Sequence, residues 1–197
     1  AGVARCLDSF GRLDILVNNA GTNPQFGLLV DAELAAVEKT WKVNQLAPLH
    51  HVQAAWRSWM RQHGGTVLNV ASIGGLRAGP MIGAYNVSKA ALIHLTRQLA
   101  IEMAPGVRVN AVAPAVVKTR FSVALYAKDE EKAAAAYPLR RLGTTDDVAA
   151  AVLFLVSDAA SWITGEVLVL DGGASVGLPL DQEAPPPSTG PNPPAAR

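Results

Sequence analysis

The chain has 197 residues, a length that suits one domain with a substantial core rather than two complete domains. Half of the residues are hydrophobic and 17% are charged, which excludes a chain that is disordered as a whole. Seventeen basic and sixteen acidic side chains give a formal net charge of +1, so bulk charge gives no reason to expect nucleic acid or an anionic membrane as a partner. We expect a small, neutral or weakly charged ligand instead.

The one cysteine, Cys6, excludes both an internal disulfide and a zinc cluster of several thiolates. No apolar run approaches the roughly 18 to 20 residues of a membrane span, and residues 1–7 lack the regions of a signal peptide. We therefore expect a cytoplasmic protein. The histidines lack metal-ligand spacing with acidic or sulfur side chains, so no metal site is predicted at His50, His51, His63 or His94.

Short aliphatic runs alternate along the chain with longer segments of helical periodicity. The runs, which we predict to be buried strands, are residues 14–17, 66–70, 107–112 and 167–170. Helices are predicted at about residues 32–60, broken near Asn44 to Pro48, and at 84–103 and 146–158. This order of strands and helices predicts an α/β fold with a parallel sheet and crossover helices.

The predicted helix at residues 84–103 combines a large apolar stripe with a small-residue flank. The stripe is formed by Leu92, Leu95, Leu99 and Met103, and the flank for close packing by Val87, Ala90, Ala91 and Ala100. Further along the chain, seven of the thirteen prolines fall within residues 179–197. We predict a domain at residues 1–178 and a proline-rich, disordered or polyproline-like tail at 179–197.

The spacing of Tyr85 and Lys89 places a phenol and an ammonium one turn apart on one helix face. A free tyrosine has a pKa near 10 and exchanges protons poorly at neutral pH, unless a neighbouring cation stabilises the phenolate. Lys89 can supply that charge. By itself the pair occurs often by chance and is more typical of a solvated helix face.

Ser72 follows the apolar run at residues 66–70, at the carboxyl end of a predicted parallel strand, where open α/β sheets bind their ligands. Its hydroxyl can hold a carbonyl oxygen, although a serine that merely opens a loop is the simpler interpretation. The glycines between Ser72 and Tyr85 allow the chain to turn back, so that the two side chains can meet.

The segment Asn18-Asn19-Ala20-Gly21 ends the first predicted strand in polar and then small residues. Small side chains there let another molecule approach the backbone closely, and a simple turn would use the same residues. The segment, Ser72 and the Tyr85–Lys89 pair occur in this order far more rarely by chance than any one alone.

With these three elements the sequence resembles the classical short-chain dehydrogenase/reductase family, over nearly all of residues 7–173. Asn44 in Lys42-Val43-Asn44 and the closing Asp171-Gly172-Gly173 extend the resemblance. It implies a Rossmann-type, doubly wound parallel sheet. It also implies hydride transfer between NAD or NADP and a ketone or secondary alcohol, with the cofactor carrying the hydride.

The resemblance further implies catalytic roles for four residues. Tyr85 would act as acid or base, and Lys89 would lower the pKa of Tyr85 and bind the nicotinamide ribose. Ser72 would orient the substrate oxygen, and Asn44 would help to hold a proton-relay water. Cofactor contacts are expected at Asn18, Ala20, Gly21, Tyr85, Lys89, Pro114 and Thr119.

Thr119 stands where the family's Pro-Gly-x-x-x-Thr segment would hold the nicotinamide amide, with Ala115 in place of the glycine. If that position requires a positive φ, alanine would strain the loop; otherwise its methyl group only narrows the pocket. Residues 120–137 would form the substrate lid, an interpretation compatible with a solvated surface helix.

The family's first strands and its glycine-rich phosphate turn have no counterpart in the sequence, so we expect an N-terminally truncated sheet. Cofactor affinity would then be weak, and NAD could not be told from NADP. The strand at residues 14–17 would form an unpaired hydrophobic edge, which favours aggregation.

The sequence is compatible with two kinds of function, an enzyme and a non-catalytic subunit. The first is an oxidoreductase, similar to 3-oxoacyl-thioester reductases or to broad ketone reductases. The second is an inactive remnant that acts as an oligomer-forming or regulatory subunit. Family members commonly form homo-oligomers, dimers or tetramers, through helices like residues 46–60 and 84–103, and Trp56, Trp59 and Met60 would suit such a contact or the core.

Overall fold

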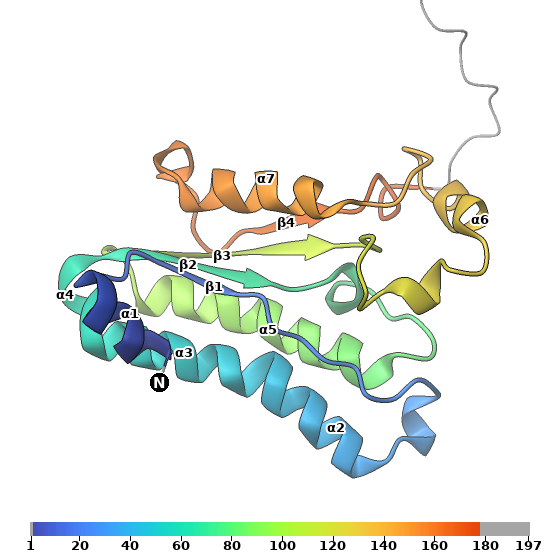
Figure 1. Cartoon of the computed structure of the whole chain (residues 1–197), viewed down its shortest axis with the longest axis horizontal. Coiled ribbons are helices and arrows are strands. Elements are labelled where there is room, and N and C mark those ends of the chain that lie inside the picture. Colours follow the sequence, from blue (N-terminus) through green and yellow to red (C-terminus); the bar gives the residue numbers. More distant parts are fainter. Residues whose placement is uncertain (1, 178–197) are drawn as a thin grey trace, which may run out of the picture.

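The computed structural model describes residues 2–177, which form a single parallel sheet covered by helices on both faces (Figure 1). The four strands are β1 (Ile15–Asn18), β2 (Gly65–Val70), β3 (Val107–Pro114) and β4 (Val167–Leu170), and they pair in that order. All four predicted strands are confirmed, as is the α/β class. The prediction of a disordered tail at residues 179–197, like residue 178 of the predicted domain, lies outside the described residues.

Seven α-helices and several shorter turns connect these strands within residues 2–177. The helices are α1 (Gly2–Phe10), α2 (Leu34–Trp41), α3 (Ala47–Ala55), α4 (Arg61–His63), α5 (Gly83–Glu102), α6 (Glu130–Ala135) and α7 (Thr145–Val156). The 3₁₀ turns are η1 (Leu29–Asp31), η4 (Ile73–Gly75), η5 (Val123–Leu125) and η6 (Asp158–Ala160), and π-helical turns form η2 (Lys42–Leu46) and η3 (Trp56–Met60).

Alternate residues of the strands serve the two helical layers, because successive side chains of a strand point to opposite faces of its sheet. Val67 and Val109 pack with Leu99 of α5 on the face that α3 and α5 cover. Leu68 and Val112 pack with Leu155 of α7 on the other. Figure 1 shows α7 above the sheet and α2, α3 and α5 below it, so the sheet is doubly wound as predicted.

The helical segment after β1 differs from the prediction of a break near Asn44 to Pro48. Helices α2, α3 and α4 follow one another without interruption from Leu34 to His63, joined by the π-helical turns η2 and η3. Pro48 follows the π-helical turn η2 almost directly; proline lacks the N–H group that would bond to the preceding turn, and its ring crowds the carbonyl there. The chain therefore widens at Asn44 instead of breaking.

Strand β1 lies at one edge of the sheet and, within the described part of the chain, pairs with β2 alone. Its Ile15 and Val17 side chains are 45% and 42% exposed. They lie on the sheet face of Leu68, on which α7 packs against β2, β3 and β4. This agrees with the hydrophobic edge expected at this strand.

The strands run in the same direction, so their carboxyl ends share one edge of the sheet. The loops that carry Gly21, Ser72 and Thr119 start from this edge, whereas Asn44, Tyr85 and Lys89 lie on helical elements. Among residues 2–177, none of the helices combines the length and the apolar character that a membrane span requires.

Candidate active site

The loops after β1 and β2 meet the first turns of helix α5. The Lys89 ammonium donates a hydrogen bond to the Val70 carbonyl at the end of β2, with 2.7 Å between Nζ and O. A Cβ atom added to Gly21 would lie 3.6 Å from Lys89 Nζ and 3.7 Å from Asn44 Oδ1. Gly21, Asn44 and Lys89, which are far apart in the sequence, are therefore neighbours.

Tyr85 lies on the same face of α5, beside Ser72 and Lys89. The Ser72 hydroxyl lies near enough to the phenol to affect its pKa, and the Lys89 ammonium lies 5.6 Å from the centre of the Tyr85 ring. Burial raises the pKa of Tyr85 above its ordinary value, and the neighbouring Ser72 hydroxyl opposes this only in part. The net shift is upward because desolvation of the phenol dominates, and the expectation that Lys89 lowers the pKa of Tyr85 stays a prediction.

Burial also acts on Lys89. Its pKa is lowered to about 8 because removal of the ammonium from water penalises the charged form. At pH 7 the ammonium still predominates, so a cation remains one helical turn from the phenol. A neutral phenol and a neighbouring cation are suited to donating a proton to a substrate oxygen and stabilising the phenolate that is left.

The fully buried side chain of Asn44 connects the loop after β1 to helix α5. Its Oδ1 accepts a hydrogen bond from Thr22 N (2.8 Å), and its Nδ2 donates to both Thr22 O and Ser88 Oγ (2.9 Å each). Ser88 Oγ in turn donates to the Tyr85 carbonyl (2.7 Å). The π-helical turn η2, a distortion often found at functional sites, carries Asn44 at this position.

The Asn18 side chain is buried and hydrogen-bonds to other side chains of the protein. Its Nδ2 donates to Asn69 Oδ1 (2.9 Å), and its Oδ1 lies 3.1 Å from His51 Nδ1. Asn69 Nδ2 continues the network to Thr96 Oγ1 of α5 (2.9 Å). The Asn18 amide therefore ties β1 to β2 and α3, while Ala20 and Gly21 continue toward Lys89 and Asn44.

Pro114 ends β3, and the segment after it approaches Tyr85 at Phe121. Among the described residues, positive φ angles outside glycine occur only at Met81 and Arg140, so Ala115 needs no left-handed conformation and its methyl group does not strain the loop. The Thr119 hydroxyl pairs with Ser122 Oγ at 3.0 Å. Two residues beyond Thr119, the Phe121 ring lies 6.0 Å from the Tyr85 ring, between centroids.

Residues 120–137, the expected lid, contain the short helix α6, which an ion pair connects to Lys118, two residues before the lid begins. Lys118 Nζ lies 2.8 Å from Glu130 Oε1, and Asp129 caps α6 through the Lys132 N–H group. The exposed acidic and basic side chains of α6 also fit a solvated surface helix.

The closing Asp171-Gly172-Gly173 forms a turn next to the expected lid. Burial alone would raise the pKa of Asp171, but hydrogen bonds from Ser175 and Gly173 lower it overall. Gly172 O accepts a hydrogen bond from Leu139 N, and Gly173 packs on Pro138. The turn thus holds Pro138 and Leu139, which directly follow the expected lid at residues 120–137.

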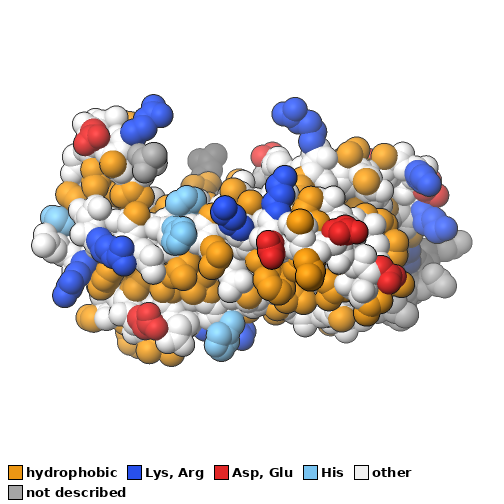
Figure 2. Space-filling view, turned by 90° about the horizontal axis from the view of Figure 1, so that it is seen from below, with side chains coloured by type: hydrophobic (Ala, Val, Ile, Leu, Met, Phe, Trp, Pro, Cys, Tyr) orange, Lys and Arg blue, Asp and Glu red, His pale blue; other side chains and the backbone are white. Residues whose placement is uncertain are grey.

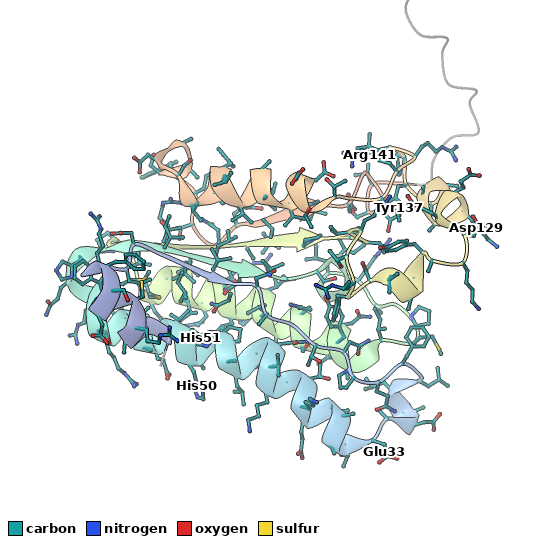
Figure 3. All side chains as sticks on the ribbon, viewed as in Figure 1. Glu33, His50, His51, Asp129, Tyr137 and Arg141 are labelled. Atoms are coloured by element: carbon teal, nitrogen blue, oxygen red, sulfur yellow. The ribbon has the colours of Figure 1, made fainter. Side chains whose placement is uncertain are left out.

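The structure offers no group of three or more His, Cys, Asp or Glu side chains that could hold a metal ion among residues 2–177. Figure 3 shows His50 and His51 on α3 in the lower layer, well apart from Asp129 and Tyr137 at the other end of the molecule.

Two residues that contact the site, Ser88 and Phe121, were not predicted from the sequence. Ser88 lies inside the Tyr85–Lys89 motif and links it to Asn44, and its position three residues after Tyr85 was a usable signal. Phe121 had no distinguishing spacing, because its contact with Tyr85 depends on the path of the chain after β3.

Comparison with known proteins agrees with this geometry. The family model described as enoyl-(acyl carrier protein) reductase matches residues 1–175. The pig protein named dehydrogenase/reductase SDR family member 4 (Sus scrofa) is 42% identical over 176 residues, which cover 88% of this chain and 63% of that protein. The chain thus spans somewhat less than two thirds of the length of this relative.

Solved structures of nicotinamide-nucleotide complexes resemble the chain over most of its length. The structure of ElxO with NADP bound has a TM-score of 0.83 and 34% identity, over 89% of this chain and 72% of that one. A 4-hydroxyisoleucine dehydrogenase mutant complexed with NADH and succinate has a TM-score of 0.82 and 30% identity, over 90% and 74%. By its sequence, its fold and the grouping of Ser72, Tyr85 and Lys89, the chain belongs to the short-chain dehydrogenase/reductase family.

Proposed function

We propose that this chain carries the catalytic residues of an NAD- or NADP-dependent oxidoreductase that interconverts a ketone and a secondary alcohol. The observation that carries this proposal is the convergence of the Lys89 ammonium on the Tyr85 ring and on Val70 O at the end of β2, next to Ser72. The family membership and the nicotinamide nucleotides named for ElxO and for the 4-hydroxyisoleucine dehydrogenase mutant support the choice of cofactor.

The residues present fit a nicotinamide nucleotide. Gly21 leaves space beside Lys89 and Asn44. An ammonium has three N–H donors, and Lys89 directs one of them to Val70 O, so it retains donors for ribose hydroxyls. Pro114 and Thr119 would border the nicotinamide from the loop after β3, and the backbone of Ala20 from the loop after β1. The bound nicotinamide supplies or accepts the hydride at the carbonyl carbon.

In the reducing direction, Ser72 donates a hydrogen bond to the substrate carbonyl oxygen and fixes its position. Tyr85 transfers its phenolic proton to that oxygen as the carbon is reduced, so that an alcohol and a phenolate result. Lys89 stabilises the phenolate by its charge. The raised pKa of Tyr85 keeps the phenol protonated before the reaction, as this direction requires.

Asn44 holds the loop at Thr22 in place and, through Ser88, the start of α5. We assign it a positioning role, together with the proton-relay water that the family resemblance implies.

The test is the variant Tyr85→Phe in the purified protein, assayed with NADH or NADPH and a ketone. Loss of the phenolic proton should lower turnover about 100-fold or more, because proton transfer by a positioned side chain typically contributes 10²- to 10⁴-fold. Ser157→Ala is the control, since it also removes one hydroxyl but lies directly after α7, where Ser157 O accepts a hydrogen bond from Arg108 near the start of β3. Unaltered turnover in Tyr85→Phe would remove the enzyme assignment and favour a non-catalytic subunit.

The protein is also proposed to form a homo-oligomer. Large hydrophobic side chains are exposed along the face of α2, α3 and α5: Trp41, Leu46 and Val87. Figure 2 shows this face, on which hydrophobic side chains lie between basic, acidic and histidine side chains. Such a mixed surface is typical of contacts between subunits.

The proposed compartment is the cytoplasm. The thiol of Cys6 is free, with Arg12 O as its hydrogen-bond acceptor at 3.5 Å, and free thiols persist in reducing compartments. Subcellular fractionation would test this placement, and recovery in a secreted fraction would contradict it.

A further inference from the structure

Large hydrophobic side chains are exposed on each of the three loops that leave the carboxyl edge of the sheet. They are Phe26 and Leu28 after β1, Leu76 and Met81 after β2, and Phe121, Val123 and Leu125 after β3. The first two loops are joined, since Gly27 N donates to Met81 O at 2.8 Å. The same loops hold Gly21, Ser72 and Thr119, so exposed apolar side chains lie on each loop that carries a site residue.

Phe121 lies directly beside the reacting phenol. Its ring centre is 6.0 Å from that of Tyr85, and the two planes are inclined by 41°. Tyr85 is largely buried, whereas Phe121 remains 59% exposed. Part of the Phe121 ring therefore contacts the phenol, and the rest is free to contact another molecule bound there.

The backbone around Phe121 is fixed. Ser122 N donates to Thr119 O, and Ser122 Oγ donates to Val117 O. Lys118 N donates to Gly143 O at the start of the segment before α7. Because these bonds hold the turn on both sides of Phe121, its ring is a preorganised surface rather than one that must be ordered on binding.

Several polar side chains of these loops already have protein partners. Thr119 pairs with Ser122, Lys118 pairs with Glu130, and Arg77 donates to Ala174 O. The side chain of Phe121, by contrast, has no polar group and offers a substrate only an apolar contact.

We propose that Phe121 is a specificity-determining residue that packs against a flat, apolar substituent on the substrate carbonyl. The site then prefers ketones that carry an aryl or similar planar group over small alkyl ketones. This inference rests on the proposed function for its reacting carbonyl. Aromatic rings prefer offset or tilted contacts at centroid distances of about 4.5 to 7 Å, and the open side of Phe121 offers such a contact.

The test compares acetophenone with 2-butanone as substrates for the unsubstituted protein and for Phe121→Ala. The variant should lose about tenfold in kcat/KM for acetophenone, mainly through KM, and less than about threefold for 2-butanone. Phe121→Trp should retain the preference for the aryl ketone. Leu153→Ala, an exposed apolar residue on α7, is the control and should change neither value.

An unchanged ratio of the two kcat/KM values would overturn the inference. An equal loss for both ketones would do the same, because it would mean that Phe121 only supports Tyr85.

A second measurement does not depend on turnover. Saturation-transfer NMR with acetophenone in the Tyr85→Phe background should show magnetisation reaching the aryl protons, and adding Phe121→Ala should remove most of it. Undiminished transfer would overturn the inference. If the unsubstituted protein reduced neither ketone, the proposed function would fail, and the NMR comparison would still decide the role of Phe121.

Discussion

Lys89 shows how one buried side chain serves the site at a cost to the stability of the fold. Its ammonium binds Val70 O and faces Tyr85, yet burial lowers its pKa to about 8. The charge needed beside the phenol is therefore maintained against the cost of removing it from water. Active sites commonly carry such a cost, because a group tuned for proton chemistry is rarely the most stable choice.

The variant Lys89→Met tests this cost through the pH dependence of unfolding. Between pH 8 and 10.5 the folded protein has released the Lys89 proton that the unfolded chain still binds, so the stability of the unsubstituted protein rises with pH relative to the variant. This rise in the free energy of unfolding, relative to that of Lys89→Met, should total roughly 3 kcal/mol. Below pH 8 the free energies of the two proteins should differ by a constant amount. Urea unfolding across pH 7 to 10.5 measures it, with the exposed Lys128→Met as control. Parallel curves for the protein and Lys89→Met would contradict the assignment.

At the scale of elements, the loop after β2 is positioned by close contact with the backbone of α5. A Cβ atom on Gly75 would lie 2.6 Å from the carbonyl carbon of Lys89 and 2.8 Å from Ala90 N, closer than any side chain tolerates. Glycine at this position lets the turn η4 rest directly on the helix. Ser72, at the start of that turn, is thereby held opposite Tyr85.

Gly75→Ala should displace the loop from α5 and destabilise the protein by about 1 to 3 kcal/mol, as overpacking against backbone typically does. Gly79→Ala is a control in the same loop, because its Cβ would meet only Asn86 Nδ2, at an ordinary 3.6 Å. We expect a lower urea midpoint and reduced ketone turnover for Gly75→Ala, with little change for Gly79→Ala. Equal behaviour of the two variants would show that the close contact does not matter.

The elements that hydrophobic periodicity marks strongly were predictable from the sequence. The strands and the helices α5 and α7 lie within a few residues of their predicted bounds, because each buries an apolar face in the core. The π-helical turn at Lys42–Leu46 was not predictable, because it accompanies hydrogen bonds from Asn44 to Thr22 and Ser88, which are distant in sequence. Propensity and spacing carry no information about such contacts.

For the site, spacing predicted that Ser72, Tyr85 and Lys89 meet, but it could not predict the balance of forces on them. The raised pKa of Tyr85 comes from burial, which depends on the packed fold rather than on the neighbouring cation alone. Likewise, the sequence could not place the Asn18 amide on Asn69 and His51.

On the scale of the whole molecule, the helical face opposite α7 combines features that suit contact with a second copy of the chain. Val87 and Ala90 of α5 are exposed, whereas Ala100 of the same predicted flank is buried in the core, so only the first part of the small flank faces outward. Trp41 and Leu46 border a groove along α2 and α3. Because Val87 lies between Tyr85 and Lys89 on the same helix, an interface there would restrict the helix that carries the reacting groups.

The double variant Leu46→Glu with Val87→Glu should therefore convert an oligomer into monomers, since it would bury two unpaired carboxylates in an apolar contact. Light scattering coupled to size-exclusion chromatography measures the mass directly. Trp162→Glu places the same charge on an exposed hydrophobic residue after α7 and η6, on the other side of the sheet, and should leave the mass unchanged. A monomeric mass for the unsubstituted protein would refute the oligomer. An oligomer that survives the double variant would place its interface elsewhere, for example along the exposed Leu153 and Phe154 of α7.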